Sequence, residues 1–277
     1  QYLDAPGLSH RVIDFCDLDS AKWTQYADDR RWPMSWLYRR EGRCLLAFER
    51  DAAARAEARV FVTEAEANLF RKAAPELAGR ISAMQNGVDS DYFSPANGGV
   101  SPYPAGGPVI VFTGAMDYWP NVDAVVWFAT ELLPKVRAQV PDARFWIVGM
   151  NPAPAVQALA GEGVVVTGTV PDVRPYLAHS DVIVAPLRIA RGIQNKVLEA
   201  MAMARAVVIS SAPATGLEAR SGHECEIAHS GEEFVSRTVS LLADVTLRRT
   251  MGLAAREAVL RSYSWSAHLA ALEKLLG

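Results

Sequence analysis

The sequence has little of what would assign it at once to a structural class. Its only cysteines, Cys16, Cys44 and Cys225, lie far apart and form no C-x-x-C pair. This usage predicts neither a zinc ribbon nor a disulfide framework, and it suits a reducing cytoplasm. The five histidines show no metal-ligand spacing either. The residues alone therefore indicate no metal site.

Long apolar runs and an excess of one charge are also missing. No stretch approaches the ~20 apolar residues of a membrane-spanning helix, and no signal peptide opens the sequence. The 28 Lys and Arg residues nearly balance 31 Asp and Glu residues, for a net charge of -3. This mild acidity, without a basic run, argues against a nucleic-acid partner.

Three familiar motifs are absent as well. The chain contains neither G-x-G-x-x-G nor G-x-x-x-x-G-K-[ST], so a dehydrogenase or a P-loop ATPase loses its main support. It also lacks the G-x-S-x-G turn of α/β-hydrolases. What remains is 277 residues, 50% of them hydrophobic, which is enough for two cores.

Apolar strand-like runs alternate with helix-like segments along most of the chain, which predicts parallel sheets covered by helices on both faces. We expect a helical region after residue 18 to be interrupted near Pro33 and Gly42. The segment "HECEIAH" (223–229) favours a strand edge with surface polar residues. The predicted strands are 11–15, 59–63, 80–89, 109–114, 144–149, 164–168, 181–187 and 206–210. The main predicted helices of the second half are 121–139, 153–160, 172–179, 195–204, 231–243, 246–261 and 264–276.

A stretch rich in proline and glycine separates two regions. We predict a partial N-terminal domain at 1–94, a linker at 95–108 and a doubly wound, Rossmann-like domain at 109–262. Residues 263–277 form a further predicted helix. Since the chain begins with Gln1 and only about 95 residues precede the linker, against ~100–200 for a full domain, we expect an N-terminally truncated chain.

The region after the predicted strand 181–187 is the most informative. In parallel sheets, ligands bind beyond the carboxyl ends of strands and at helix N-termini. Here Arg188, Arg191 and Lys196 gather near the start of a helix that we expect Asn195 to cap. Cations repel one another and the helix dipole at that end. A bound multivalent anion would offset this cost.

Glu199 follows just inside the same helix. A carboxylate can accept two hydrogen bonds from the vicinal hydroxyls of a ribose, so phosphates on the helix start and ribose on Glu199 would describe a nucleotide diphosphate. A solvated charged loop, with Glu199 stabilising the first turn, explains the same residues. Glycines that end strands, such as Gly114, either let a ligand approach or simply form turns. The residues leave these alternatives open.

The motifs "NGVD", "TGTVPDV" and "KVLEAMA", in this order, resemble GT-B glycosyltransferases of family 4. The opening "VIDFCDLDSAKWTQYA" resembles, more narrowly, sugar transferases of bacterial exopolysaccharide systems. The resemblance implies a GT-B-like α/β fold of two Rossmann-like domains, one of them partial here. It also implies retaining transfer from a UDP- or GDP-sugar without a metal ion or other cofactor.

Matched residue by residue, the resemblance gives a set of donor-binding positions. Glu199 would hold the ribose, Gly192 and Ile193 would offer backbone N–H groups, Gly114 would admit the donor, and Val170 would lie near the base. The family's preceding motif carboxylate would fall on position 191, where this chain has arginine. The loop "GAMDYWPN" also lacks the usual cations. We hypothesise that Arg188, Arg191 and Lys196 neutralise the diphosphate instead. The catalytic residues stay unassigned.

The expected function is therefore a cytoplasmic glycosyltransferase that acts on a glycan or lipid-linked acceptor in exopolysaccharide synthesis. Such a role would allow peripheral association with the inner face of a membrane. A GT-B nucleotide-sugar epimerase or hydrolase, and a donor-binding fragment without activity, are the alternatives. Trp119, in the loop after Gly114, is the one tryptophan placed to stack on a sugar. Trp127 and Trp146 are expected in the core.

Overall fold

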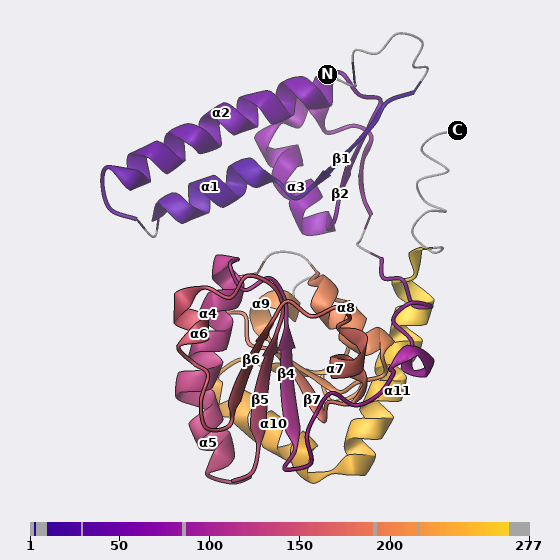
Figure 1. Cartoon of the computed structure of the whole chain (residues 1–277). Helices are drawn as coiled ribbons and strands as arrows, with labels where there is room; N and C mark the ends of the chain where they lie inside the picture. Colours follow the sequence, from indigo (N-terminus) through magenta and orange to yellow (C-terminus); the bar gives the residue numbers. More distant parts are fainter. Residues whose placement is uncertain are drawn as a thin grey trace. The chain divides into compact units, whose positions relative to one another are not determined.

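The chain divides into two compact units with their border between Asn86 and Gly87 (Figure 1). The computed structural model describes residue 3 and residues 10–28, 30–84, 87–190, 193–214 and 217–265. The predicted linker belongs to the second unit, because the Tyr103 hydroxyl donates to the Tyr176 carbonyl at 2.6 Å. The border between the units, at residues 86 and 87, thus lies before residue 94, where the N-terminal domain was predicted to end. Beyond Trp265, the predicted C-terminal helix lies outside the described residues.

The first unit is a small parallel sheet with helices. Its strands follow the order β1-β2-β3, and each neighbouring pair is parallel. Phe15, Phe61 and Phe70 stack on one another in its core. The elements are β1 (Val12–Cys16), α1 (Asp19–Asp28), α2 (Met34–Ala54), β2 (Ala58–Phe61), α3 (Glu64–Ala73), the short 3-10 turn Pro75–Leu77 and β3 (Ile81–Ala83).

Helices α1 and α2 form a hairpin. The predicted interruption near Pro33 is confirmed, since α1 ends at Asp28 and α2 begins at Met34. The interruption predicted near Gly42 is wrong, because α2 runs through this residue. A Cβ atom on Gly42 would lie 2.8 Å from Thr24 Oγ1 and 3.1 Å from the Ser20 carbonyl oxygen. The glycine therefore permits close helix packing instead of breaking the helix.

The second unit is a doubly wound domain built on six parallel strands in the order β6-β5-β4-β7-β8-β9. Counted from the first strand of this unit, this is the Rossmann order 3-2-1-4-5-6. The chain changes direction across the sheet between β4 and β7. The strands are β4 (Val109–Thr113), β5 (Arg144–Val148), β6 (Val164–Gly168), β7 (Val182–Ala185), β8 (Val207–Ser210) and β9 (Glu226–Ala228).

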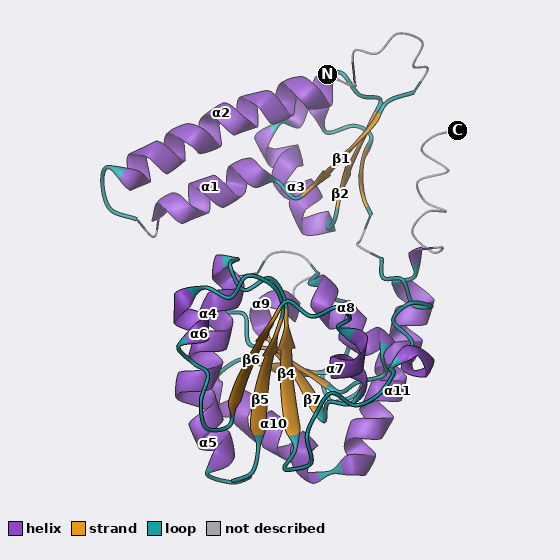
Figure 2. Ribbon diagram, viewed as in Figure 1, coloured by secondary structure: helices purple, strands orange, loops and turns teal. Residues whose placement is uncertain are grey.

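Helices cover both faces of this sheet (Figure 2). Alternate strand residues face opposite sides: Val182 and Val184 join one apolar cluster, and Ile183 and Ala185 join the other. The helical elements are the 3-10 turn Pro95–Asn97, α4 (Trp119–Trp127), a π segment (Phe128–Leu132), α5 (Leu133–Arg137), α6 (Pro154–Gln157), α7 (Arg174–Ala178), α8 (Asn195–Ala202), α9 (Ser211–Ala214), α10 (Gly231–Ala243) and α11 (Val245–Ser262).

The predicted helix 121–139 is observed as three consecutive segments, which are α4, the π segment and α5. Pro134 has no N–H group to donate to the carbonyl four residues earlier, and the π segment lies directly before α5, which contains this proline. The Thr130 hydroxyl donates to the Val126 carbonyl at 2.8 Å. The apolar pattern therefore predicted the helical course but not the change in its winding.

Candidate functional site

The candidate site lies at the carboxyl ends of β4 and β7, where the strand order reverses. In open parallel sheets this is the crevice where ligands bind. Gly114 follows β4, and helix α8 follows β7 after a loop. Both segments come from predicted strand ends, so the sheet brings together residues that are far apart in the sequence.

Two glycines let the loops after β4 and β5 approach each other. A Cβ atom on Gly149 would lie only 1.7 Å from the Gly114 carbonyl oxygen, and both residues have positive φ angles, +150° and +155°. The Gly114 N–H donates to the Val148 carbonyl at 3.1 Å. Side chains at these positions would be strained and would clash. Gly114 therefore permits the close approach of the loop after β5, and the approach of a donor to Gly114 stays a prediction.

Lys196 points from the first turn of α8 back toward Gly114. A Cβ atom on Gly114 would lie 2.9 Å from Lys196 Nζ and 2.8 Å from Asn121 Nδ2. Lys196 Nζ donates to Asn121 Oδ1 at 2.5 Å and lies 4.1 Å from the centre of the Phe112 ring. Burial lowers the pKa of Lys196 to about 7. This cation is therefore held inside the site and is poorly solvated.

Glu199 lies nearly one turn further along α8, and it is partly buried. Burial raises the pKa of its carboxyl group, and Lys196 opposes this shift. Across the described part of the chain, no residue donates a hydrogen bond to this carboxylate. Its oxygens therefore retain acceptor capacity, as the ribose role requires.

Arg188 takes part in an ion pair that the sequence did not indicate, and its donor-binding role stays a prediction. Its guanidinium forms a bidentate ion pair with Asp123 of α4, with Nε 3.0 Å from Oδ2, and lies over the Trp127 ring. The pair raises the pKa of Arg188. Because Asp123 already balances its charge, Arg188 does not repel Lys196 as an isolated cation would.

The remaining predicted donor-binding residues are Arg191, Gly192, Ile193 and Val170. Arg191 and Gly192 lie outside the described residues. Ile193 is buried in the apolar cluster beneath α8, and Val170 packs beside Val148 in a smaller cluster. Helix α8 begins at Asn195 with Gln194 in the N-cap position, so the prediction that Asn195 caps the helix is wrong by one residue.

Asn121 and Phe112 were missed by the sequence analysis. Asn121 is buried, accepts from Lys196 and donates through Nδ2 to the Ala115 carbonyl at 2.8 Å. A buried asparagine with both ends bonded orients the cation. The only signal is that Asn121 is one of two polar residues in the otherwise apolar helix "WPNVDAVVW". Trp119 is half-exposed, while Trp127 packs against the core as expected.

Neither a metal-binding cluster nor a membrane-spanning helix is found in the part of the chain that the structure describes. Within those ranges, no group of three or more His, Cys, Asp or Glu side chains is arranged to hold a metal ion. No described helix is both long and apolar enough to cross a membrane.

Comparison with known proteins identifies the second unit. Residues 107–244 match the model of a family described as glycosyl transferases group 1. No curated protein sequence matches the chain. A glycosyltransferase from Rickettsia africae ESF-5 has a TM-score of 0.66 and 16% identity, over 94% of this chain and 80% of that one.

Two further solved structures are similar over both units. HepE from Anabaena, in complex with UDP, has a TM-score of 0.71 and 15% identity, over 95% of this chain and 71% of that one. Sucrose-phosphate synthase from Thermosynechococcus elongatus has a TM-score of 0.69 and 17% identity, over 95% of this chain and 66% of that one. The chain spans only part of each of these proteins. It has the Rossmann-like GT-B fold, and the match to glycosyl transferases group 1 lies within its second unit.

Proposed function

We propose that the second unit binds a nucleotide-diphosphate sugar and that the chain belongs to a retaining glycosyltransferase. The observation that carries the proposal is the meeting of Gly114, Lys196 and Glu199 at the strand-order reversal. The Nζ of Lys196 would contact the diphosphate, and the Glu199 carboxylate would accept hydrogen bonds from the ribose. Stabilisation of the departing diphosphate by this cation and the start of α8 would assist transfer.

We propose that residues of the site supply the charge and hydrogen bonds that the diphosphate needs. A buried Lys196 is costly to charge in the free protein, and a diphosphate would offset that cost. We propose that Arg191 contributes a second cation and that Gly192 and Ile193 contribute backbone donors. We propose that Arg188, which is paired with Asp123, contributes the third cation near the diphosphate.

Calorimetric titration with UDP and GDP tests the donor site. HepE, which was solved with UDP, makes UDP the first ligand to try. We expect one nucleotide to bind and Glu199→Ala to weaken it by about 1–3 kcal/mol, the scale of a lost charged hydrogen bond. Glu232→Ala, on the exposed start of α10, is the matched control. Equal affinity in Glu199→Ala and wild type would contradict the ribose role.

Product analysis tests the reaction. A transferase needs an acceptor, whereas a nucleotide-sugar epimerase or hydrolase turns over the donor alone. We propose a glycan or lipid-linked acceptor and a role in exopolysaccharide synthesis. Turnover of UDP-sugar without acceptor would favour the epimerase or hydrolase instead, and donor binding without any turnover would favour an inactive donor-binding fragment.

A surface of the first unit supports the proposed peripheral association with a membrane. At the turn between α1 and α2, Trp32 is 81% exposed and Trp36 is 56% exposed. Arg30, Arg31 and Arg43 form no ion pair with any residue that the structure describes. Exposed tryptophans beside free arginines suit an anionic lipid surface, where the rings enter the interface and the cations meet headgroups.

Vesicle sedimentation tests this association. We expect the chain to sediment with vesicles that contain phosphatidylglycerol and not with pure phosphatidylcholine vesicles. The double variant Trp32→Ala/Trp36→Ala should reduce the bound fraction several-fold. Trp119→Ala removes a tryptophan of similar exposure, 50%, from the second unit and should not change it. Equal losses in both variants would contradict a surface at the helical hairpin.

A further inference from the structure

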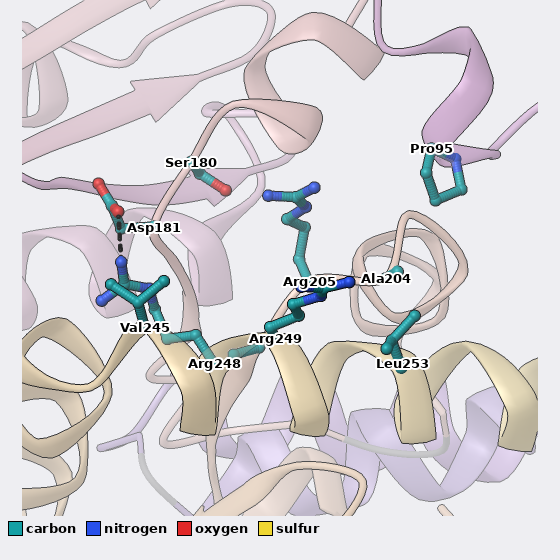
Figure 3. A pocket seen from close by; sticks show the side chains of 10 residues that line it. Pro95, Ser180, Asp181, Ala204, Arg205, Val245, Arg248, Arg249 and Leu253 are labelled. Atoms are coloured by element: carbon teal, nitrogen blue, oxygen red, sulfur yellow. Dashed lines mark hydrogen bonds and ion pairs between the residues drawn. The ribbon is translucent and has the colours of Figure 1, made fainter.

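A second cavity lies at the opposite edge of the six-stranded sheet from the candidate donor site. It has a volume of about 410 Å³ and is lined by residues just before β7, residues just before β8 and the first half of α11 (Figure 3). The amino ends of β7 and β8 meet here, whereas Lys196 and Glu199 follow the carboxyl end of β7. The proposed function therefore makes no use of this cavity.

The lining of the cavity carries an excess of positive charge. It contains Arg205, Arg248 and Arg249 but only one carboxylate, that of Asp181. Asp181 accepts from the Val109 N–H at 2.8 Å and from Arg248 Nη2 at 3.0 Å. The Asp181 charge is thus paired with Arg248, which leaves Arg205 and Arg249 without a compensating charge in the cavity wall.

Arg248 is held in place by structural bonds. Its Nη1 donates to the carbonyls of Leu241 and Leu242, at 2.7 and 2.8 Å. These carbonyls lie in the last turn of α10, where a helix lacks internal donors. Arg248 therefore joins α10, α11 and β7, and its role is explained without a ligand.

Arg205 is positioned rigidly but is only partly satisfied. Its N–H donates to the Ala200 carbonyl at 3.1 Å, and the Ala204 N–H donates to Met201 at 2.9 Å. This pair of bonds is the Schellman ending of helix α8. Ala204 occupies the left-handed position with φ +54°, where glycine is usual. The backbone thereby directs the Arg205 side chain toward Ser180 and Pro95 (Figure 3).

The terminal nitrogens of Arg205 are solvent-accessible donors in the cavity wall. Its Nε donates to the Met203 carbonyl at 3.3 Å, which is an ordinary helix-capping contact. Within the described ranges, Nη1 and Nη2 of Arg205 have no hydrogen-bond acceptor in the protein. Burial lowers the pKa of this guanidinium; the charge of Asp181 opposes the shift, and that of Arg248 adds to it. A cation that is partly desolvated and has unused donors favours an anion in the cavity.

The remaining lining indicates what kind of anion fits. Pro95, Ala204 and Leu253 give one side of the cavity an apolar portion, while Val245 lies on the other side (Figure 3). The volume falls in the range of about 300–1,000 Å³ that is typical of small-molecule sites. An anion that also carries an organic group would use both portions of the wall. A phosphate monoester matches this combination, because its phosphate can accept the forked donors of arginine.

We propose that this cavity binds an organic phosphate, with the phosphate group on Arg205 and Arg249 and the organic group against Pro95 and Leu253. This site is separate from the nucleotide-sugar site, and it would place a second ligand on the same domain. Ser180, whose hydroxyl already donates to the Leu177 carbonyl at 2.8 Å, can still accept a hydrogen bond from a ligand hydroxyl.

Calorimetric titration of the whole chain with phenyl phosphate and inorganic phosphate tests the proposal. The protein is first saturated with UDP, and the titration is repeated on Lys196→Met without UDP, so that the donor site cannot account for the signal. We expect phenyl phosphate to bind under both conditions and more tightly than inorganic phosphate. Arg205→Gln and Arg249→Gln should each weaken it about tenfold or more, as expected for lost charge-assisted bonds.

Arg261→Gln is the matched control, because Arg261 lies on α11 outside the cavity lining. It should leave the affinity for phenyl phosphate unchanged. Arg249 is exposed, so its variant should fold even if Arg205→Gln does not. Three results would each overturn the proposal: no binding of phenyl phosphate, an affinity unaffected by Arg249→Gln, or an affinity no higher than that of inorganic phosphate.

Discussion

At the scale of single residues, Lys196 is the most unusual group in the candidate site. Its pKa is lowered to about 7 because the ammonium is buried, and Glu199 only partly opposes the shift. At pH 8 the side chain is therefore mostly neutral in the free protein. A bound diphosphate should raise this pKa again, since a nearby anion favours the charged form.

We therefore predict that UDP binding at pH 8 takes up close to one proton. The measurement is calorimetry in buffers of different ionisation enthalpy, where the slope of observed enthalpy gives the proton number. Lys196→Met removes the titrating group and should bind UDP with little proton uptake. If the variant takes up as many protons as wild type, another group is responsible.

The same lowered pKa predicts a pH dependence of stability. An unfolded lysine titrates near 10.4, so between pH 7 and that value the unfolded chain binds one more proton than the folded one. Stability then rises with pH, by at most about 1.4 kcal/mol per pH unit. Urea unfolding at pH 7 and pH 9 should show this rise in wild type relative to Lys196→Met. Parallel pH profiles for the two proteins would contradict the assignment.

Gly149 tests the close approach of the loops after β4 and β5. A Cβ atom there would lie 1.7 Å from the Gly114 carbonyl oxygen, whereas one on Gly168 would meet nothing within 4 Å. Gly168→Ala, at φ +68°, gives the cost of left-handed strain alone, about 1–2 kcal/mol. Gly106→Ala, at φ +157° beside only the flexible end of Arg144, controls for the backbone conformation of Gly149, at φ +150°. Gly149→Ala should reduce the free energy of unfolding by clearly more than Gly168→Ala or Gly106→Ala. Similar losses would show that strain alone matters.

At the scale of elements, the sequence predicts strands better than helix details. All five strands expected in the second unit are present within a few residues, because continuous apolar runs have few alternatives in a covered parallel sheet. For β9 the sequence predicts only a strand edge with surface polar residues, because Glu226 interrupts the apolar run. The π segment depends on where Pro134 falls in a helix, which periodicity does not report.

The candidate site is likewise predictable from the sequence only in part. Position at a strand end and helix start is readable from the sequence, and so are Lys196 and Glu199. The pairing of Lys196 with Asn121 and of Arg188 with Asp123 joins residues of α4 to residues after β7. Such pairs depend on the order of strands in the sheet, and no local pattern in the sequence reports it.

The α1–α2 hairpin gives a prediction at this scale. Replacing glycine by alanine inside a helix usually stabilises it by about 0.5–1 kcal/mol. For Gly42, the new Cβ atom would lie 3.1 Å from the Ser20 carbonyl oxygen and 2.8 Å from Thr24 Oγ1. Gly42→Ala should therefore destabilise the first unit, as measured by urea unfolding. Gly79→Ala, where a Cβ atom would meet nothing within 4 Å, should be nearly neutral. A stabilised Gly42→Ala variant would contradict the tight packing.

At the scale of the whole molecule, two units with separate cores share one chain. The aromatic core around Phe61 and Phe70 serves the first unit, while the two clusters on either face of the six-stranded sheet serve the second. Separate cores make separate unfolding the expected behaviour.

We predict that differential scanning calorimetry resolves two transitions and that UDP raises the midpoint of only one. A ligand stabilises the unit that binds it in proportion to the logarithm of its concentration above Kd, about 2.7 kcal/mol at 100 times Kd. Because Lys196 and Glu199 both belong to the second unit, only its transition should move.

Gly42→Ala should lower the other transition without changing the UDP shift, and Glu199→Ala should reduce the shift without moving the other transition. A single transition that both variants lower together would instead mean that the two cores unfold as one cooperative unit.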